Sequence, residues 1–240
     1  LSPPHFRDIV SGRRRGFVPA LWRCVLRVAE YPYRWEVQRR NHHYDSGRLE
    51  VERVGVPVIS VGNITMGGTG KTPMVEWLAR WFRQHDVRVC LISRGYGAEE
   101  GSRNDEALEL EQKLPDVPHV QNPDRIEAAR MAVEEFATQL IILDDAFQHR
   151  RIHRDLNIVL IDAIEPFGYD HVFPRGTLRE PLTGLSRADV VVLTRADMTD
   201  ADGRFQIRAG AAQYHAAETW EELNHAPQRL PSSSDGRQDS

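Results

Sequence analysis

The sequence predicts an α/β fold in which a parallel β-sheet is covered by helices on both faces. From residue 56 onward, short apolar runs rich in Val, Ile and Leu alternate with stretches compatible with helices. The runs are almost continuously apolar, which is typical of strands buried on both faces. The expected strands are Val56–Val61, Val87–Ser93, Leu140–Leu143, Asn157–Ile161 and Val190–Leu193, and the expected helices are Met74–Gln84, Glu106–Lys113, Pro123–Ala137 and Asp200–Tyr214. Ligands of such a sheet bind at the carboxyl ends of its strands.

The first 50 residues differ from this pattern. Arg13–Arg15 precede the stretch Phe17–Val28, in which helical spacing places Leu21, Val25 and Val28 on one face. A basic amphipathic helix of this kind can lie in a membrane interface. The alternative is a helix that packs on its own domain with the arginines in water, and the residues alone favour this alternative.

A glycine-rich loop directly follows the first expected strand. Residues 60–72 read S-V-G-N-I-T-M-G-G-T-G-K-T, and a helix is expected after them. Strand, glycine loop and helix form the context of a phosphate-binding loop, here in a G-G-x-G-K-T variant whose strict first glycine is a threonine. The expected nucleotide-binding residues are Gly67, Gly68, Thr69, Gly70, Lys71 and Thr72. Lys71 would meet the outer phosphates and the Thr72 hydroxyl would hold Mg²⁺. The alternative is a glycine turn with an exposed Lys-Thr pair.

Acidic residues follow two of the later strands. Asp144 and Asp145 end the run Leu140–Leu143, which is how phosphate-loop enzymes present carboxylates to Mg²⁺ and its waters. Because adjacent side chains on a strand face opposite ways, we expect the two acids to have different tasks. Asp162 ends another strand, and the sequence leaves open whether it holds a catalytic water or caps a turn.

Several other polar residues have two interpretations each. Asp105 lies at the start of an expected helix, where it either complements the helix dipole or acts as a general base, and the pattern favours the first. Arg94 follows the second strand, and residues 173–181 form a long loop with two arginines and an acid; these charges either reach a phosphate or are solvated.

His149 and His153 have an i, i+4 spacing, but the arginines between them disfavour a metal site. Thr194–Asp197 weakly matches a base-reading motif, and a turn is the simpler interpretation.

Composition limits the range of functions. The net charge of −4 gives no general attraction to nucleic acid. The two cysteines, Cys24 and Cys90, have neither a metal-site nor a disulfide-framework spacing, which fits a reducing compartment. No run reaches the roughly 18 apolar residues of a membrane span, and no signal-peptide pattern is present.

Taken together, these segments resemble the tetraacyldisaccharide 4′-kinase family of lipid A biosynthesis. The matching stretches are S-V-G-N-I-T-M-G-G-T-G-K-T-P (60–73), S-R-G-Y-G (93–97), D-D-A-F-Q-H-R-R (144–151), R-D-L-N-I-V-L-I-D (154–162) and P-R-G-T-L-R-E-P (174–181). They occur in the order found in the family. The resemblance implies a phosphate-loop NTPase-like fold and ATP-Mg²⁺-dependent phosphorylation of the 4′-hydroxyl of tetraacyldisaccharide 1-phosphate to give lipid IVA.

The resemblance also assigns roles. The family's catalytic aspartate, in a G-D-E-P motif, falls on Asp105, although the flanking glycine and proline are replaced here. The implied catalytic residues are Asp105, Lys71, Asp145, Arg125 and Arg179; the implied substrate-binding residues are Arg94, Tyr96, Glu106 and Glu180; and the implied Mg²⁺ ligands are Thr72 and Asp144. The N-terminal helix matches a membrane-docking segment, which now favours the interfacial interpretation. A monomer bound peripherally to the cytoplasmic face of the bacterial inner membrane is expected, with the lipid A disaccharide precursor as its partner.

The expected organisation is a membrane-docking segment at 1–50, a kinase core at 51–225 and a polar, disordered tail at 226–240. Family members continue into a smaller C-terminal domain with G-I-G-N-P and D-H motifs, which do not occur in these 240 residues. The sequence is therefore expected to be a fragment or a processed chain. Two alternatives to the kinase remain: a phosphate-loop NTPase that couples hydrolysis to a partner, and a non-catalytic ATP-binding fragment.

Overall fold

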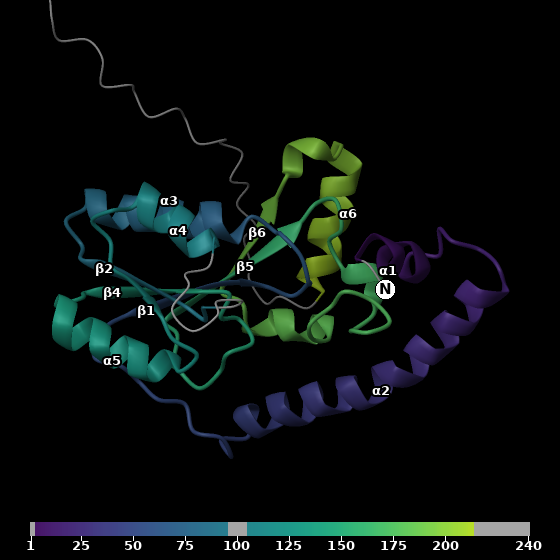
Figure 1. The fold of residues 1–240 in the computed structure, drawn as a ribbon, viewed down its shortest axis with the longest axis horizontal. Coiled ribbons are helices and arrows are strands. Elements are labelled where there is room, and N and C mark those ends of the chain that lie inside the picture. Colours follow the sequence, from purple (N-terminus) through teal and green to yellow (C-terminus); the bar gives the residue numbers. More distant parts are fainter. Residues whose placement is uncertain (1–2, 96–104, 214–240) are drawn as a thin grey trace, which may run out of the picture.

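The computed structural model describes residues 3–95 and 105–213 of the chain (Figure 1). The expected tail at 226–240 and Tyr96 therefore lie outside the described residues, and so do the side chains of Asp105 and Glu106. Within the described ranges, a β-sheet forms the centre of the molecule and helices lie on both of its faces, which confirms the predicted fold class.

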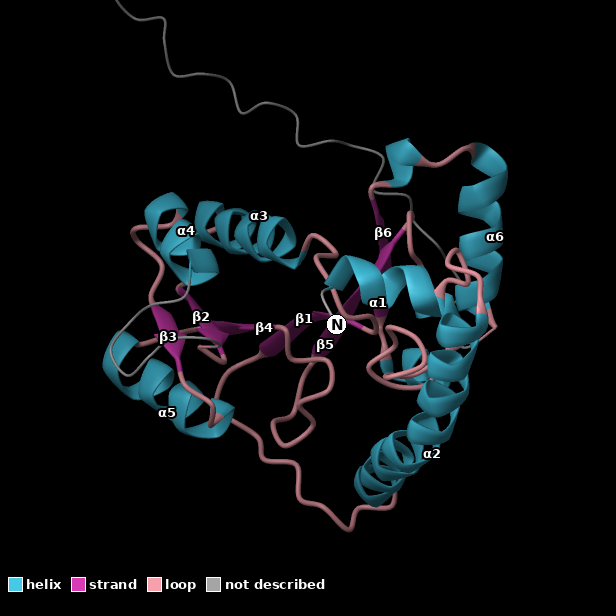
Figure 2. Cartoon of the chain, turned by 45° about the vertical axis from the view of Figure 1, so that its right-hand side comes forward, coloured by secondary structure: helices cyan, strands magenta, loops and turns pink. Residues whose placement is uncertain are grey.

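The sheet has six strands in the order β3-β2-β4-β1-β5-β6, and every pairing is parallel (Figure 2). The strands are β1 (Val58–Asn63), β2 (Val89–Ser93), β3 (His119–Gln121), β4 (Leu140–Asp144), β5 (Leu156–Asp162) and β6 (Val190–Thr194). Five of them were expected to within two residues at each end. The sixth, β3, spans three half-buried residues at the sheet edge, too short to leave a periodic signal.

Alternate strand residues face two separate apolar layers. Ile59, Val61 and Ile142 pack with residues of α3 (Lys71–Gln84) and near α4 (Asp105–Lys113), whereas Val58 and Ile141 pack on α5 (Arg125–Phe136) across the other face. A third cluster joins β5 and β6 to α6 (Ala201–Ala212). Three short 3₁₀ turns complete this part of the chain, at Gly168–Asp170, Leu182–Arg187 and Ala196–Met198. This layering holds the carboxyl ends of β1, β2 and β4 at one edge.

Helix α3 begins three residues earlier than expected. Gly70 has a left-handed backbone (φ 80°) and is the residue before the helix, so Lys71, Thr72 and Pro73 form the first turn. The expected helix began directly after Pro73. Proline is tolerated in the first turn of a helix, because the N–H groups there have no intrahelical acceptor. The sequence reasoning therefore placed the two polar residues of the loop outside the helix to which they belong.

The N-terminal segment consists of α1 (Pro3–Val10) and the 29-residue α2 (Phe17–Asp45), which runs along one side of the core (Figure 1). Leu26, Glu30 and Val37 are the buried residues of α2, and Pro32 lies inside it. The first half of α2 exposes several apolar side chains, among them Phe17, Leu21 and Val28, whereas most exposed residues of its second half are charged or polar. No helix within the described ranges is both long and apolar enough to cross a membrane.

Candidate functional site

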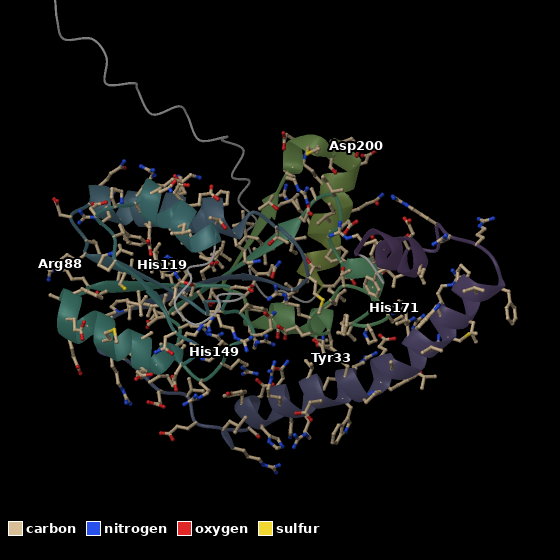
Figure 3. The ribbon with its side chains drawn as sticks, viewed as in Figure 1. Tyr33, Arg88, His119, His149, His171 and Asp200 are labelled. Atoms are coloured by element: carbon tan, nitrogen blue, oxygen red, sulfur yellow. The ribbon has the colours of Figure 1, made fainter. Side chains whose placement is uncertain are left out.

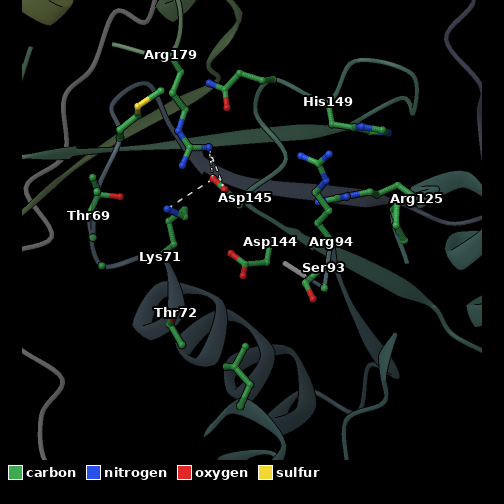
Figure 4. A pocket seen from close by; sticks show the side chains of 18 of the residues that line it. Thr69, Lys71, Thr72, Ser93, Arg94, Arg125, Asp144, Asp145, His149 and Arg179 are labelled. Carbon is green, nitrogen blue, oxygen red and sulfur yellow. Dashed lines mark hydrogen bonds and ion pairs between the residues drawn. The ribbon is translucent and has the colours of Figure 1, made fainter. Parts of the chain in front are cut away.

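A cavity of about 1010 Å³ opens at the carboxyl ends of β1, β2 and β4 (Figure 4). Its walls come from the glycine loop, the ends of β2 and β4, the start of α5, the segment after β4 and two residues of α2. The lining includes these predicted site residues: Gly67, Gly68, Thr69, Gly70, Lys71, Thr72, Arg94, Arg125, Asp144, Asp145 and Arg179. Segments far apart in the sequence therefore meet at one place, where a parallel sheet binds its ligands.

The glycine loop has the backbone that phosphate binding needs. Gly67 (φ 128°) and Gly70 (φ 80°) occupy conformations that residues with a Cβ rarely adopt. A buried hydrogen bond also stabilises the loop: the Asn63 amide donates to the Thr69 hydroxyl at 2.9 Å. The loop then leads into α3, whose first N–H groups and helix dipole favour an anion.

Two cations share one carboxylate beside this loop. Lys71 Nζ lies 3.6 Å from Asp145 Oδ1, and Arg179 Nη1 lies 2.9 Å from each Asp145 oxygen (Figure 4). All three side chains are partly exposed to the cavity. Asp145 thus holds a lysine and an arginine from distant segments in one place, ready to meet phosphate oxygens.

Asp144 and Asp145 both line the cavity, and the prediction that they have different tasks stays a prediction. Strand β4 ends at Asp144, and Asp145 adopts a left-handed backbone (φ 50°), so strand alternation no longer applies and both acids line the cavity. Asp144 is almost buried, with 8% of its surface exposed. Asp144 and Thr72 offer the oxygen ligands that Mg²⁺ prefers. The described residues contain no group of three or more His, Cys, Asp or Glu side chains that could hold a metal ion.

A second group of basic side chains lies across the cavity. Arg94, Arg125 and His149 gather on the side away from Lys71 and Arg179, with the two aspartates between the groups in this view (Figure 4). Arg125 begins α5 and is 3% exposed. Burial, assisted by the neighbouring Arg125 charge, lowers the pKa of His149 to about 4, so its imidazole is neutral at physiological pH.

His149 and His153 do not form a helical pair. The segment from Asp145 to Arg151 is a turn rather than a helix, so the i, i+4 spacing carries no metal geometry. His153 lies 3.5 Å from Asp155 instead. The interpretation of His149 as a structural or phosphate-proximal residue is compatible with its place in the cavity wall.

The structure does not support direct substrate contact by Glu180. This residue is 1% exposed, is absent from the cavity wall, and is bound by Arg187 at 2.7 Å, Gln148 at 3.0 Å and Asn41 at 3.2 Å. Its carboxylate instead supports Gln148, which does line the cavity. A sequence pattern shows only that the acid is near Arg179; it cannot show which way the side chain turns.

Asp162 is a turn residue here. Its carboxylate accepts from the Ile164 N–H at 3.0 Å and pairs with Arg195. Arg195 precedes the 3₁₀ turn Ala196–Met198, which agrees with the turn interpretation of that motif. Asp162 lines a separate cavity of about 110 Å³ on the other side of the glycine loop, which also contains Arg7 of α1.

Sequence reasoning missed several residues of the main cavity, and Tyr33, Arg40 and Gln148 are among them. Tyr33 and Arg40 come from α2, and Gln148 from the turn after β4. Gln148 lies within a stretch that already carried the family resemblance. Tyr33 and Arg40 had no local signal, because only the tertiary structure brings α2 to this cavity.

The comparisons with known proteins agree with this geometry. A family model described as tetraacyldisaccharide-1-P 4′-kinase matches residues 22–238. A tetraacyldisaccharide 4′-kinase from Desulfatibacillum aliphaticivorans is 43% identical over 72% of this chain and 52% of its own length. One from Chlorobaculum parvum is 42% identical over 71% of this chain and 53% of its own.

A solved structure is similar as well. The crystal structure of LpxK from Aquifex aeolicus in complex with ATP has a TM-score of 0.67 and 39% identity, covering 73% of this chain and 60% of that one. The chain spans about half the length of the first two curated relatives that it matches.

Proposed function

Since the chain belongs to the tetraacyldisaccharide 4′-kinase family, we propose that it transfers the γ-phosphoryl group of ATP to the 4′-hydroxyl of tetraacyldisaccharide 1-phosphate, giving lipid IVA in lipid A biosynthesis. One observation carries the proposal: the glycine loop, Lys71, Asp145 and Arg179 meet at the wall of one large cavity. Loop amides and two cations at fixed positions are what phosphoryl transfer requires, because its catalysis is mainly positioning and charge stabilisation.

The nucleotide end has a clear set of candidates. The backbone of Gly67–Gly70 and the side chain of Lys71 would bind the phosphates, and Thr72 with Asp144 would hold Mg²⁺. Bound Mg²⁺ supplies charge neutralisation between the β- and γ-phosphates. Lys71 and Arg179 would neutralise the oxygens of the transferred group, while Asp145 keeps both cations in place.

The acceptor end is the second part of the proposal. The 4′-hydroxyl oxygen attacks the γ-phosphorus in line with the leaving group, the bond to the β,γ-bridging oxygen breaks, and ADP leaves. Asp105 takes the hydroxyl proton as general base. Arg125 would stabilise phosphate charge, and Arg94, Tyr96 and Glu106 would bind the acceptor.

Incorporation of label from γ-labelled ATP into detergent-solubilised tetraacyldisaccharide 1-phosphate tests the reaction. We expect label in the lipid with Mg²⁺ present, and a loss of about 10²-fold or more in Asp105→Asn, since this change removes the base but keeps a side chain that suits a helix start. Asp202→Asn in the first turn of α6 is the matched control. ATP affinity should remain unchanged in both variants.

Each contrary result has a distinct meaning. Label that survives Asp105→Asn makes Asp105 a helix-start residue and removes the base from the mechanism. Phosphate released into water without label in the lipid points to an NTPase, and ATP binding without either product points to a non-catalytic fragment. Both of the last two outcomes contradict the proposed function.

We further propose that α2 docks the protein on the cytoplasmic face of the bacterial inner membrane. Phe17, Leu21, Val25 and Val28 are 84%, 55%, 49% and 70% exposed, and Arg13–Arg15 precede them in water. An exposed apolar stripe next to basic residues suits an interfacial helix on anionic lipid. It would bring the cavity to an acceptor whose acyl chains lie in the bilayer.

Vesicle sedimentation tests this docking. Leu21→Asp combined with Val25→Asp should weaken binding to anionic vesicles by about tenfold or more, since each buried apolar side chain contributes about 1.5–3 kcal/mol. Phe205→Asp, at a 72% exposed position on α6, is the control and should bind like the wild type. Equal binding by all three proteins rules out α2 as the docking element.

We also propose that the protein acts as a monomer, because the charged groups beside the glycine loop, Lys71, Asp145 and Arg179, already meet within a single chain. Sedimentation equilibrium in detergent should give the mass of one chain. A stable dimer would contradict this.

A further inference from the structure

The inner side of α2 holds the segment that carries Arg179. Glu30 contacts Arg175 at 3.2 Å, the Tyr33 hydroxyl donates to the Arg179 carbonyl at 3.0 Å, and the Asn41 amide donates to Glu180 at 3.2 Å. Positions 30, 33 and 41 share one side of a helix. Figure 3 shows Tyr33 on the side of α2 that faces the rest of the molecule. This side of the helix is therefore fastened to the segment after β5.

The backbone of Arg179 is held from two directions. Its N–H donates to the carbonyl of Ile64, directly before the glycine loop, at 2.8 Å, and its own carbonyl accepts from Tyr33. Two residues earlier, the Thr177 carbonyl accepts from the Met66 N–H at 2.7 Å. The Arg179 peptide thus lies between the glycine loop and α2, and Tyr33 supplies the contact on the α2 side.

Tyr33 is well placed for this contact. Its ring packs edge-to-face on Phe173, with centroids 5.7 Å apart, which fixes the direction of the hydroxyl. Burial raises the pKa of Tyr33, so the hydroxyl is protonated and donates at neutral pH. Tyr31, two residues earlier, is 69% exposed and has no such contact among the described residues.

We propose that Tyr33 is a positioning residue for phosphoryl transfer, which acts by holding Arg179 so that its guanidinium stays on Asp145 beside Lys71. This inference rests on the proposed function of the same cavity. Transfer depends steeply on the place of each charged group, since a displacement of about 1 Å can lower the rate by about 10²-fold. The hydroxyl donates to the main-chain carbonyl of Arg179, so we expect the effect of removing it to pass through that arginine.

A double-mutant cycle tests the route. Tyr33→Phe removes one hydroxyl and leaves the ring on Phe173, and Tyr31→Phe makes the same chemical change at an exposed position. We expect Tyr33→Phe to lower kcat by roughly tenfold with little change in the KM for ATP, and Tyr31→Phe to behave as the wild type. In an Arg179→Ala background, Tyr33→Phe should have no further effect, because the guanidinium that it positions is gone.

Two results would overturn the inference. One is an equal kcat for Tyr33→Phe and Tyr31→Phe. The other is the same loss from Tyr33→Phe with and without the Arg179 side chain, which would mean a general structural defect.

Hydrogen exchange separates this inference from the proposed function, since it needs no acceptor. Faster exchange of residues 177–181 in Tyr33→Phe, and not in Tyr31→Phe, supports the positioning contact even if the wild type transfers no phosphate to the lipid. Unchanged exchange argues against the contact. Absence of transfer by the wild type overturns only the proposed reaction.

Discussion

The two ends of the main cavity are built in different ways. At the glycine-loop end, Lys71 and Arg179 are held on Asp145 by ion pairs from fixed elements, and Asn63 fastens the loop. At the opposite end, Arg125 is buried at a helix start beside a neutral His149. At the first end, Lys71 and Arg179 share one carboxylate, whereas the second end brings Arg94 and Arg125 together with a neutral imidazole. Under the proposed function, the glycine-loop end would bind the polyphosphate of ATP and the opposite end would meet the acceptor.

The largest expected effect is at the glycine-loop end. Lys71→Ala removes the cation nearest the outer phosphates and should lower kcat by about 10³-fold, the upper range for removal of one charge-stabilising group. Lys113, the only other lysine in the sequence, pairs with Glu109 and Glu76 at the surface. Lys113→Ala should therefore keep full activity. Steady-state kinetics on both variants decide whether the loop end dominates catalysis.

A smaller and different effect is expected at the opposite end. Arg125→Ala should reduce kcat/KM for the acceptor by roughly 10²-fold while ATP affinity changes by less than about twofold. Arg130, on the same helix and 65% exposed in its side chain, is the control. Parallel thermal unfolding shows whether the buried substitution also destabilises the fold. Equal losses in ATP affinity and in kcat/KM for the acceptor would contradict different roles for the two ends of the cavity.

The smallest effect concerns pH. His149 has a pKa of about 4 in the folded protein against 6.5 for an ordinary histidine, so the unfolded chain binds more protons between these values. Its contribution therefore makes the folded state less stable as pH falls from 6.5 to 4. His149→Gln should flatten the fall in Tm over that window, whereas His42→Gln, at an exposed position of α2, should not. An unchanged slope in His149→Gln would mean that burial of this imidazole has no energetic consequence.

The sequence was sufficient for most features that depend on a local pattern, although it placed the start of α3 three residues too late. The strand before Gly67, the loop itself and the acids after β4 each lie in a continuous stretch whose period or motif is visible. The sequence identified Asp145 as a site residue but not the direction of its side chain, because strand alternation does not extend to a residue with a left-handed backbone. Tyr33 and the true partners of Glu180 depend on where α2 lies against the core, and no short stretch of sequence contains that information.

Pro32 removes one hydrogen bond from the interior of α2. Because proline has no N–H, the Val28 carbonyl has no partner four residues on, and the ladder is interrupted between the exposed apolar stretch and the residues that follow, Tyr33 to Asn41. We therefore expect the helix to be weakest at this turn, so that amides before the proline exchange faster than those after it. Amide exchange should resolve two classes of protection along Phe17–Asp45, and a single class would show one cooperative helix. A disturbance at the outer end of the helix would meet this weak turn one residue before Tyr33, the residue that contacts Arg179.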